Sequence, residues 1–288
     1  MGQQLKRRPR PALRRAAVVA LLGSLVFLAG CSAQTQHEWK NLAMPDPATE
    51  QADHIFYLWR YAWIAALITG GIVWGLIFWV VVRYRRRSDD EIPVQTRYNL
   101  PLEIFYTIAP IIMVIVFFYH TVDAQNAVLE DTDQDYTIDV VGQQWSWTFN
   151  HILDGADEGP VVYTYGTGSI IPTLVLPVDK TVEFRLNSPD VIHSFGIPGF
   201  LMRMDVVPGR VNSYEVTPDT EGTFVGKCYE LCGTYHSRML FKVEVVSESE
   251  YLAYLDELEA KGNSSDDSVL GGNFVNEQVG LDAEEESE

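Results

Sequence analysis

Cysteine is scarce in this sequence. Only three of the 288 residues are cysteines, at positions 31, 228 and 232. A scaffold held together by several disulfides is therefore excluded, because three cysteines can form one disulfide at most. Two of the three lie close together in the stretch CYELCGTYHSRM (228–239), which also contains a histidine and a methionine. This stretch needs a chemical explanation.

Basic residues are scarce in the second part of the chain. Residues 123–288 contain 31 acidic and 8 basic residues, whereas residues 1–122 contain 8 acidic and 13 basic ones. Such a split indicates that the two parts lie in different environments. The acidic part repels nucleic acid and attracts a basic protein, so we expect no nucleic-acid partner.

The N-terminus has the features of an export signal. The basic stretch KRRPRPALRR (6–15) precedes the apolar run AAVVALLGSLVFLAG (16–30), which is short for a membrane span. LAGC (28–31) resembles a bacterial lipoprotein cleavage box. We therefore expect residues 1–30 to be removed and Cys31 to be lipidated. The alternative is an ordinary signal peptide with an incidental cysteine.

Two further apolar segments predict a transmembrane hairpin. Residues 61–82 carry no charge, and residues 104–119 reach the length of a span when extended to 102–122. The loop between them contains five arginines, which places it in the cytoplasm by the positive-inside rule. The N-terminus and everything after residue 122 then lie on the outer face of a bacterial cell membrane.

After the hairpin the pattern becomes that of strands. YTIDVVGQQWSWTF (136–149) is rich in β-branched and aromatic residues, and TLVLPVDKTVEFRLNS (173–188) indicates two strands broken at 177–179. Short strands separated by turn signals predict an all-β sandwich or barrel. SESEYLAYLDELEAK (247–261) predicts a helix capped by Ser247 or Ser249, and from Gly262 the polar, acidic tail predicts disorder.

The expected organisation has five parts. They are a signal peptide (1–30), an exported linker (31–54), the hairpin (55–122), the sandwich (123–247), and a helix with an acidic tail (248–288).

Three chemistries can explain residues 228–239. Cys228 and Cys232 could form a disulfide, because the domain is exported, but the ring would be very tight. They could bind zinc together with His236 and another histidine, although Met239 has no part in zinc chemistry. Copper would use thiolate, imidazole and thioether together.

A copper site in a β-sandwich needs a histidine from an earlier strand. His37 and His54 precede the first span, His120 ends the second, and His151 is expected in an acidic loop. His193, in SPDVIHSFGIP, lies at the end of a strand in apolar surroundings. Two thiolates four residues apart can bridge two metal ions, each with one histidine. Met239 and a backbone carbonyl between the cysteines can complete the set.

At this point the chain resembles subunit II of cytochrome c oxidase, a haem–copper oxidase subunit with a binuclear CuA centre. The resemblance covers about residues 55–247. The family pattern C-x-E-x-C-x3-H-x2-M is complete here, and HSF (193–195), DVVPGR (205–210) and GQQWSW (142–147) match further landmarks. Tyr229 departs from the pattern, because the family often has a smaller residue there. The fold that the resemblance implies is a Greek-key, cupredoxin-like sandwich behind a two-helix hairpin.

The resemblance implies a role for each residue of the site. Cys228 and Cys232 would bridge two copper ions, and His193 and His236 would bind one each. Met239 would ligate one copper ion and the carbonyl of Glu230 the other. The side chain of Glu230 would reach a magnesium ion shared with subunit I.

Two more roles follow from the resemblance. Trp145 matches the aromatic residue through which electrons enter from cytochrome c. The alternative for Trp145 and Trp147 is packing in the core, and we expect packing or support for Trp147. Glu103 matches the acid at the mouth of a proton channel, and an acid just inside a span is a functional hypothesis by default. The alternative for Glu103 is an interfacial charge that reaches water.

The implied function is electron transfer from cytochrome c, free or tethered in a supercomplex, to haem in subunit I. Oxygen is reduced there to water, and the reaction is coupled to proton pumping. The expected partners are subunit I, the other oxidase subunits and the membrane. One alternative is a membrane-tethered copper carrier without an oxidase partner, and another is a structural zinc or disulfide module. A quinol oxidase subunit of the same fold would lack the copper ligands.

Overall fold

The computed structural model describes residues 18–19, 33–88, 91–130, 132–153 and 159–269. Most of the expected signal peptide, Cys31 and the acidic end of the chain lie outside these residues. The chain divides into two compact units, residues 1–45 and 46–288. In the first unit the described structure is mainly the short helix α2 (Ala33–Lys40), which was not expected in the linker.

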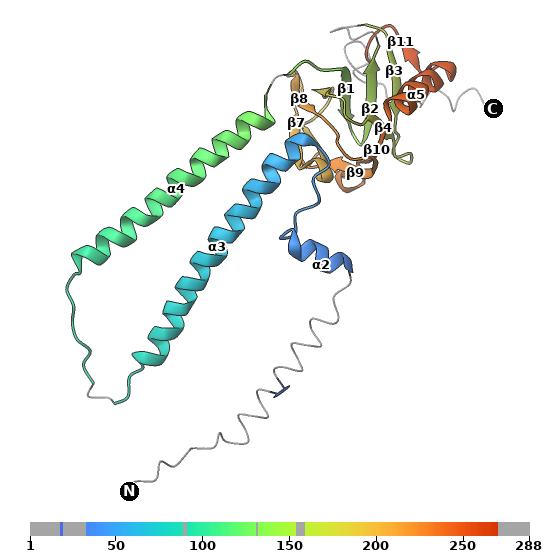
Figure 1. The fold of residues 1–288 in the computed structure, drawn as a ribbon. Coiled ribbons are helices and arrows are strands. Elements are labelled where there is room, and N and C mark those ends of the chain that lie inside the picture. The colour runs from blue at the N-terminus through green and yellow to red at the C-terminus, as the bar shows by residue number, and fades with distance from the viewer. Residues whose placement is uncertain (1–17, 20–32, 89–90, 131, 154–158, 270–288) are drawn as a thin grey trace. The chain divides into compact units, whose positions relative to one another are not determined.

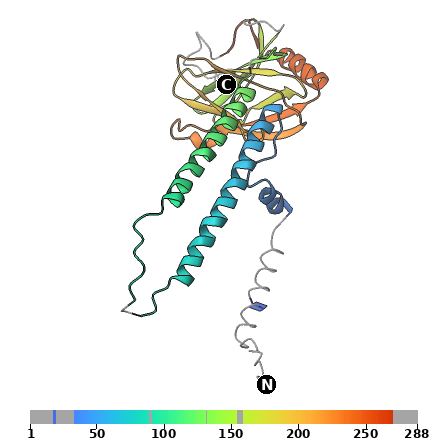
Figure 2. The same ribbon diagram turned by 60° about the vertical axis from the view of Figure 1, so that its left-hand side comes forward.

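Two long apolar helices form a hairpin in the second unit. They are α3 (Glu50–Arg83) and α4 (Leu100–Val128), and both are long and apolar enough to cross a membrane. Figures 1 and 2 show them side by side, and they contact each other. The side chains of Thr49 and Asn99 cap their N-termini by accepting hydrogen bonds from Ala52 N and Leu102 N. Both helices extend beyond the expected hairpin, α3 at its start and α4 at its end.

A β-sandwich follows the hairpin (Figure 1). The first sheet has the order β11-β3-β2-β1-β5-β8 and the second has the order β4-β10-β9-β6-β7. The strands of the first sheet are β1 (Tyr136–Gln143), β2 (Ser146–Ile152), β3 (Val161–Tyr165), β5 (Val182–Asn187), β8 (Asn212–Val216) and β11 (Ser264–Ser265). Those of the second are β4 (Thr173–Pro177), β6 (His193–Ile197), β7 (Met202–Val206), β9 (Gly222–Cys228) and β10 (Leu240–Val246).

Neighbours in these sheets are mostly distant in sequence. β1 pairs in parallel with β5, and β4 pairs in parallel with β10, while the remaining pairs are antiparallel. The core between the sheets is aromatic, with Trp147, Phe149, Phe184, Phe195 and Phe241 all fully buried. The fold class expected from the sequence, a membrane hairpin followed by a β-sandwich and a short helix, is confirmed.

The stretch 136–149 is a hairpin. Its two strands, β1 and β2, are antiparallel and turn at residues 144–145, with Gln143 opposite Ser146. Trp145 therefore lies in the turn, and Trp147 in β2. Trp145 and Trp147 do not share the face of one strand, because the chain reverses direction between residues 143 and 146.

Residues 46–52 belong to the sandwich, although they were expected in an exported linker. Ala48 N donates a hydrogen bond to Gly199 O (2.9 Å), and Asp219 N donates one to Ala48 O (3.2 Å). Thr49 forms an isolated β-bridge with Pro218. Ala48 and Ala52 are buried, with exposed fractions of 2% and 0%. The chain therefore contributes to the sandwich before its first span as well as after its second.

The C-terminal helix α5 (Glu248–Ala260) packs on the outside of the sandwich through Tyr251, Leu255 and Leu258. Ser247 caps it in a capping box with Glu250, as one of the two expected caps. Residues 264–269 then run along the first sheet, where Val269 N donates to the side chain of Asn150 (2.9 Å). This part of the expected disordered tail is ordered.

Candidate metal centre

Three elements at one end of the sandwich carry the predicted ligands. His193 is the first residue of β6, and Cys228 is the last residue of β9. The chain then loops through Cys232 to a 3-10 turn, η2 (His236–Arg238), and Met239 leads into β10. Because β9 and β10 are antiparallel neighbours, Cys228 and Met239 lie opposite each other, and Cys228 N donates to Met239 O (3.0 Å).

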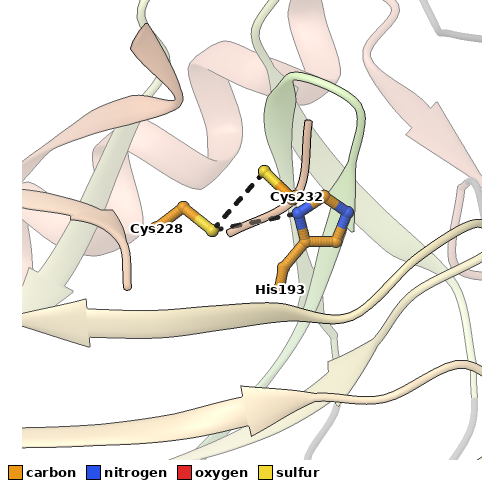
Figure 3. Close-up of side chains that lie close together, drawn as sticks. All are labelled: His193, Cys228 and Cys232. Atoms are coloured by element: carbon orange, nitrogen blue, oxygen red, sulfur yellow. Dashed lines mark hydrogen bonds between the residues drawn. The ribbon is translucent and has the colours of Figure 1, made fainter. Parts of the chain in front are cut away.

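The two thiols and His193 form the centre of the site (Figure 3). The sulfur atoms of Cys228 and Cys232 are 3.8 Å apart, and both residues are free cysteines. A disulfide would bring the sulfurs to about 2.05 Å. His193 Nδ1 lies 3.9 Å from Cys228 Sγ, and all three side chains are buried.

The remaining predicted donors approach the same two sulfurs. His236 Nδ1 lies 3.6 Å from Cys232 Sγ, and Met239 Sδ lies 3.8 Å from it. The carbonyl oxygen of Glu230 lies 3.2 Å from Cys228 Sγ. The fold therefore gathers six donors: two thiols, two imidazoles, one thioether and one carbonyl. Thiolate, thioether and imidazole are a donor set that copper favours, so these residues fit a copper pair.

Asp190 orients His193 from behind. Asp190 Oδ1 lies 2.9 Å from His193 Nε2 and accepts a hydrogen bond from Nε2–H, which leaves Nδ1 facing the sulfurs. Burial lowers the pKa of His193, but the hydrogen bonds to Asp190 and Cys228 outweigh burial and raise it. Burial raises the pKa of Asp190, but the bonds from His193, Gln144 N and Val191 N outweigh it and lower the pKa.

The pKa values of the two thiols are shifted in opposite directions. Burial raises the pKa of Cys228, but its hydrogen bonds to His193 and to the backbone of Ser194 outweigh burial and lower the pKa. Burial and the neighbouring Cys228 together raise the pKa of Cys232. In the metal-free protein Cys228 is therefore the thiol that ionises first. Metal binding would require both to lose their protons.

Trp145 lies directly against the ligand loop. Its indole N–H donates to the carbonyl of Cys232 (3.3 Å), and Gln144 Nε2 donates to the same oxygen (2.7 Å). Gly233, which follows, has φ +122°, and a Cβ built there would lie 3.0 Å from Gln144 Nε2. Trp145 is half-buried, and its ring meets that of Tyr235 edge-on at 4.9 Å between centroids.

Trp147 packs in the core, as expected. It is fully buried and contacts the rings of Phe195 and Phe241. Its indole N–H donates to Met239 O (3.4 Å), so it also supports the ligand loop.

The predicted acids lie apart from the sulfurs. The side chain of Glu230 is exposed, while its carbonyl faces Cys228. Glu103 is half-buried in the first turn of α4, and Asn99 N donates to its Oε1 (2.9 Å). Glu103 thus accepts the backbone N–H of the N-cap residue Asn99, a structural role that the sequence analysis did not consider.

Four neighbours of the ligands were missed from the sequence: Asp190, Gln144, Gly233 and Tyr235. The sequence Asn-Ser-Pro-Asp (187–190) places a carboxylate three residues before a ligand histidine, a signal that could have identified Asp190.

The expectation for His151 was wrong. It lies in β2, fully buried, and its Nδ1 is 3.0 Å from the hydroxyl of Tyr251. The acidic residues that suggested a loop follow it in the chain, whereas His151 itself still belongs to the strand.

Comparisons with known proteins identify the family of the chain. The family model described as the periplasmic domain of cytochrome c oxidase subunit II matches residues 167–246, and the one for its transmembrane domain matches residues 37–121. A probable cytochrome c oxidase subunit 2 from Streptomyces coelicolor is 45% identical, over 90% of this chain and 91% of its own length. Cytochrome c oxidase subunit 2 from Mycobacterium tuberculosis is 37% identical, over 89% and 85%.

Among solved structures, the periplasmic domain of subunit II of cytochrome oxidase from Bradyrhizobium japonicum is 28% identical. The match covers 45% of this chain and 97% of that one, with a TM-score of 0.41.

Proposed function

Since the chain belongs to the cytochrome c oxidase subunit II family, we propose that it is the electron-accepting subunit of a haem–copper oxidase. In this function it takes electrons from cytochrome c and delivers them to haem in subunit I. Oxygen is reduced there to water, and that reaction is coupled to proton pumping. The observation that carries the proposal is the convergence of four further donors on two cysteine sulfurs 3.8 Å apart.

A bound copper pair supplies one-electron redox chemistry. Cys228, Cys232, His193 and His236 would hold the two ions through their thiolates and imidazoles. Met239 and the carbonyl of Glu230 would be the two weak ligands. The hydrogen bond from His193 Nε2 to Asp190 fixes the imidazole so that Nδ1 is the ligand atom.

The sandwich excludes water from the sulfurs. Cys228, Cys232 and Met239 are at most 4% exposed, and Trp147 and Phe241 pack beneath them. A dry, rigid donor set needs little rearrangement when its charge changes, and burial around the sulfurs tunes the potential.

Trp145 is the proposed point at which electrons arrive. It is half-exposed at the surface and bonded to the backbone of the ligand Cys232, so it joins the solvent to the ligand loop through one ring and one hydrogen bond.

The two acids have separate proposed roles. The carbonyl of Glu230 faces the sulfurs, whereas its side chain is exposed. The side chain would therefore be free to hold a magnesium ion shared with subunit I. Glu103 would lie at the mouth of a proton channel, in addition to capping α4.

The organisation expected from the sequence is part of the proposal. Residues 1–30 would be removed and Cys31 lipidated, and the copper domain and mature N-terminus would lie on the outer face of a bacterial cell membrane. Residues 46–52 are better placed with the sandwich than with the linker. Mass spectrometry of the mature N-terminus tests the lipidation, and an unmodified chain that begins before Cys31 would contradict it.

Electron paramagnetic resonance on the copper-loaded full chain, with a metal count, tests the centre. We expect two copper ions per chain and a hyperfine pattern from one electron shared equally by both. A single localised copper, or zinc without a signal, would overturn the proposal. Co-purification of haem with the tagged chain separates the oxidase subunit from a copper carrier without an oxidase partner.

A further inference from the structure

A groove beside Trp145 is not used by the proposed ligand set. It has a volume of about 270 Å³ and lies between the β1–β2 turn, the loop from β3 to β4, and η2. Its lining includes Trp145, Arg238 and the hydroxyl residues Ser146, Thr167, Ser169 and Ser237. A group seated in this groove therefore touches the residue at which electrons are proposed to arrive.

The outer wall of the groove is preformed. Ser169 N and Ile170 N donate to Thr167 Oγ1 (3.3 and 3.2 Å), and Thr167 N donates to Ile170 O (3.0 Å). Gly166 N donates to Trp147 O (2.9 Å), which ties the loop to the core. A wall held by its own hydrogen bonds costs little further ordering when a partner binds.

Arg238 is the one charged side chain among the lining residues. It is exposed, and its guanidinium carbon lies 5.4 Å from the ring centroid of Tyr235, which in turn contacts Trp145. The ion pairs of the described residues give Arg238 no carboxylate partner. Stacking on the tyrosine holds the guanidinium in place and leaves its N–H donors for an anion.

The groove differs in charge from the rest of the molecule. The chain carries a net charge of −18, but none of the described residues that line this groove is acidic. The acid next to Trp145 along the surface, Asp190, is already occupied by His193, Gln144 and Val191. An arginine fork with hydroxyl donors around it is a site that recognises carboxylates.

We infer that this groove receives a carboxylate of the electron-donating cytochrome, read by Arg238 and positioned by Tyr235. The inference rests on the proposed function, and it adds a partner contact that the overall acidity of the chain does not suggest. The donor would be attracted from a distance through its basic residues. One of the donor's acidic residues would then bind in the groove and position the donor next to Trp145.

The test uses the purified, copper-loaded oxidase and a small basic c-type cytochrome, either native or with its carboxylates converted to amides. The variants are Arg238→Gln and the matched control Arg203→Gln. Arg203 also lies over a tyrosine ring, Tyr229, but on β7 and outside the groove, so the change in net charge is the same. Steady-state KM and kcat are measured for each pair.

For each protein we compare the KM for the amidated cytochrome with the KM for the native one. We expect this ratio to be about ten times larger for the wild type and for Arg203→Gln than for Arg238→Gln. The kcat and the spectrum of the copper centre should stay unchanged. Equal responses of all three proteins to amidation would overturn the inference and leave the proposed function intact. A wild type that accepts electrons from no c-type cytochrome would overturn both.

Because Arg238 adjoins the ligands His236 and Met239, Arg238→Gln could disturb the centre, which its copper spectrum would reveal. Arg238→Lys, which keeps the charge but loses the fork, then replaces it, and we expect part of the response to amidation to be lost. A full wild-type response in Arg238→Lys with an intact spectrum would count against bidentate recognition.

Discussion

Asp190 determines which nitrogen of His193 faces the sulfurs. Its carboxylate accepts a hydrogen bond from Nε2–H, so the neutral ring presents the lone pair of Nδ1 to a metal ion. An amide at this position could donate as well as accept, and it would hold the ring less firmly. The residue therefore matters for metal affinity although it is not among the six donors.

We predict that Asp190→Asn lowers copper affinity by about 10- to 100-fold while the sandwich stays folded. Copper affinity is measured by competition with a chelator, and folding by circular dichroism. Asp256→Asn, on the exposed side of α5, removes the same charge and should leave the affinity unchanged. Equal losses in both variants would mean that only net charge matters.

Gly233 allows Gln144 and Trp145 to reach the same carbonyl. Its φ of +122° is unfavourable for any side chain, and a Cβ would lie 3.0 Å from Gln144 Nε2 and 3.2 Å from Trp145 Nε1. A side chain here must therefore displace the turn that carries Trp145.

We predict that Gly233→Ala destabilises the metal-free chain by about 1–3 kcal/mol and slows electron uptake from cytochrome c. Denaturant unfolding and stopped-flow reduction are the measurements. Gly209→Ala is the control, because Gly209 also has a positive φ (+75°), but a Cβ there would meet no described atom within 4 Å. If both variants slowed electron uptake equally, the contact with Trp145 would not be the cause.

At the scale of elements, His151 couples β2 to α5. Its ring is fully buried between the strand and the helix, bonded to the hydroxyl of Tyr251 and edge-on to the ring of Tyr254. Burial lowers the pKa of His151 to about 3. In the unfolded chain the pKa returns to about 6.5, so between these values the unfolded state binds a proton that the folded state excludes.

We therefore predict that the metal-free chain loses stability as the pH falls from about 6.5 towards 3. The contribution of His151 has a slope of at most about 1.4 kcal/mol per pH unit. His151→Gln should flatten the pH dependence of the free energy of unfolding by that amount. Because Asp190 also has a lowered pKa, the difference between the two proteins is the quantity to compare. Parallel curves for wild type and variant would contradict the prediction.

At the scale of the whole molecule, the net charge of −18 produces a field that reaches well beyond any single contact. Salt shortens this field, to about 10 Å at 0.1 M ionic strength. We predict that turnover with a basic cytochrome c slows as ionic strength rises, because steering weakens. Turnover measured from 10 to 300 mM salt, roughly the range over which screening changes most, checks this. Salt-independent turnover would favour a donor tethered in a supercomplex.

Much of the molecule follows from local patterns in the sequence. The two spans are continuous apolar runs, and five of the six donors lie within residues 228–239, so their proximity needs no knowledge of the fold. The sixth donor, His193, could be predicted because a copper site in a sandwich needs a histidine from another strand.

What could not be predicted depends on contacts between distant segments. Asp190 and Gln144 act only because β6, the β1–β2 turn and the ligand loop meet in space. The burial of Ala48 depends on Gly199 and Asp219, more than 150 residues away. The composition around His151 predicted a solvent-exposed loop, because the chain becomes acidic just after the strand ends.

The pairing of residues 46–49 with the sandwich has a consequence for biogenesis. Ala48 and Thr49 are synthesised before the first span, whereas their partners Gly199, Pro218 and Asp219 are synthesised after the second. The two parts can meet only if both lie on the same side of the membrane. A chain inserted with one span, or with one end retained, leaves the buried place of Ala48 empty. The sandwich is therefore complete only in a chain whose two helices have both inserted as a hairpin.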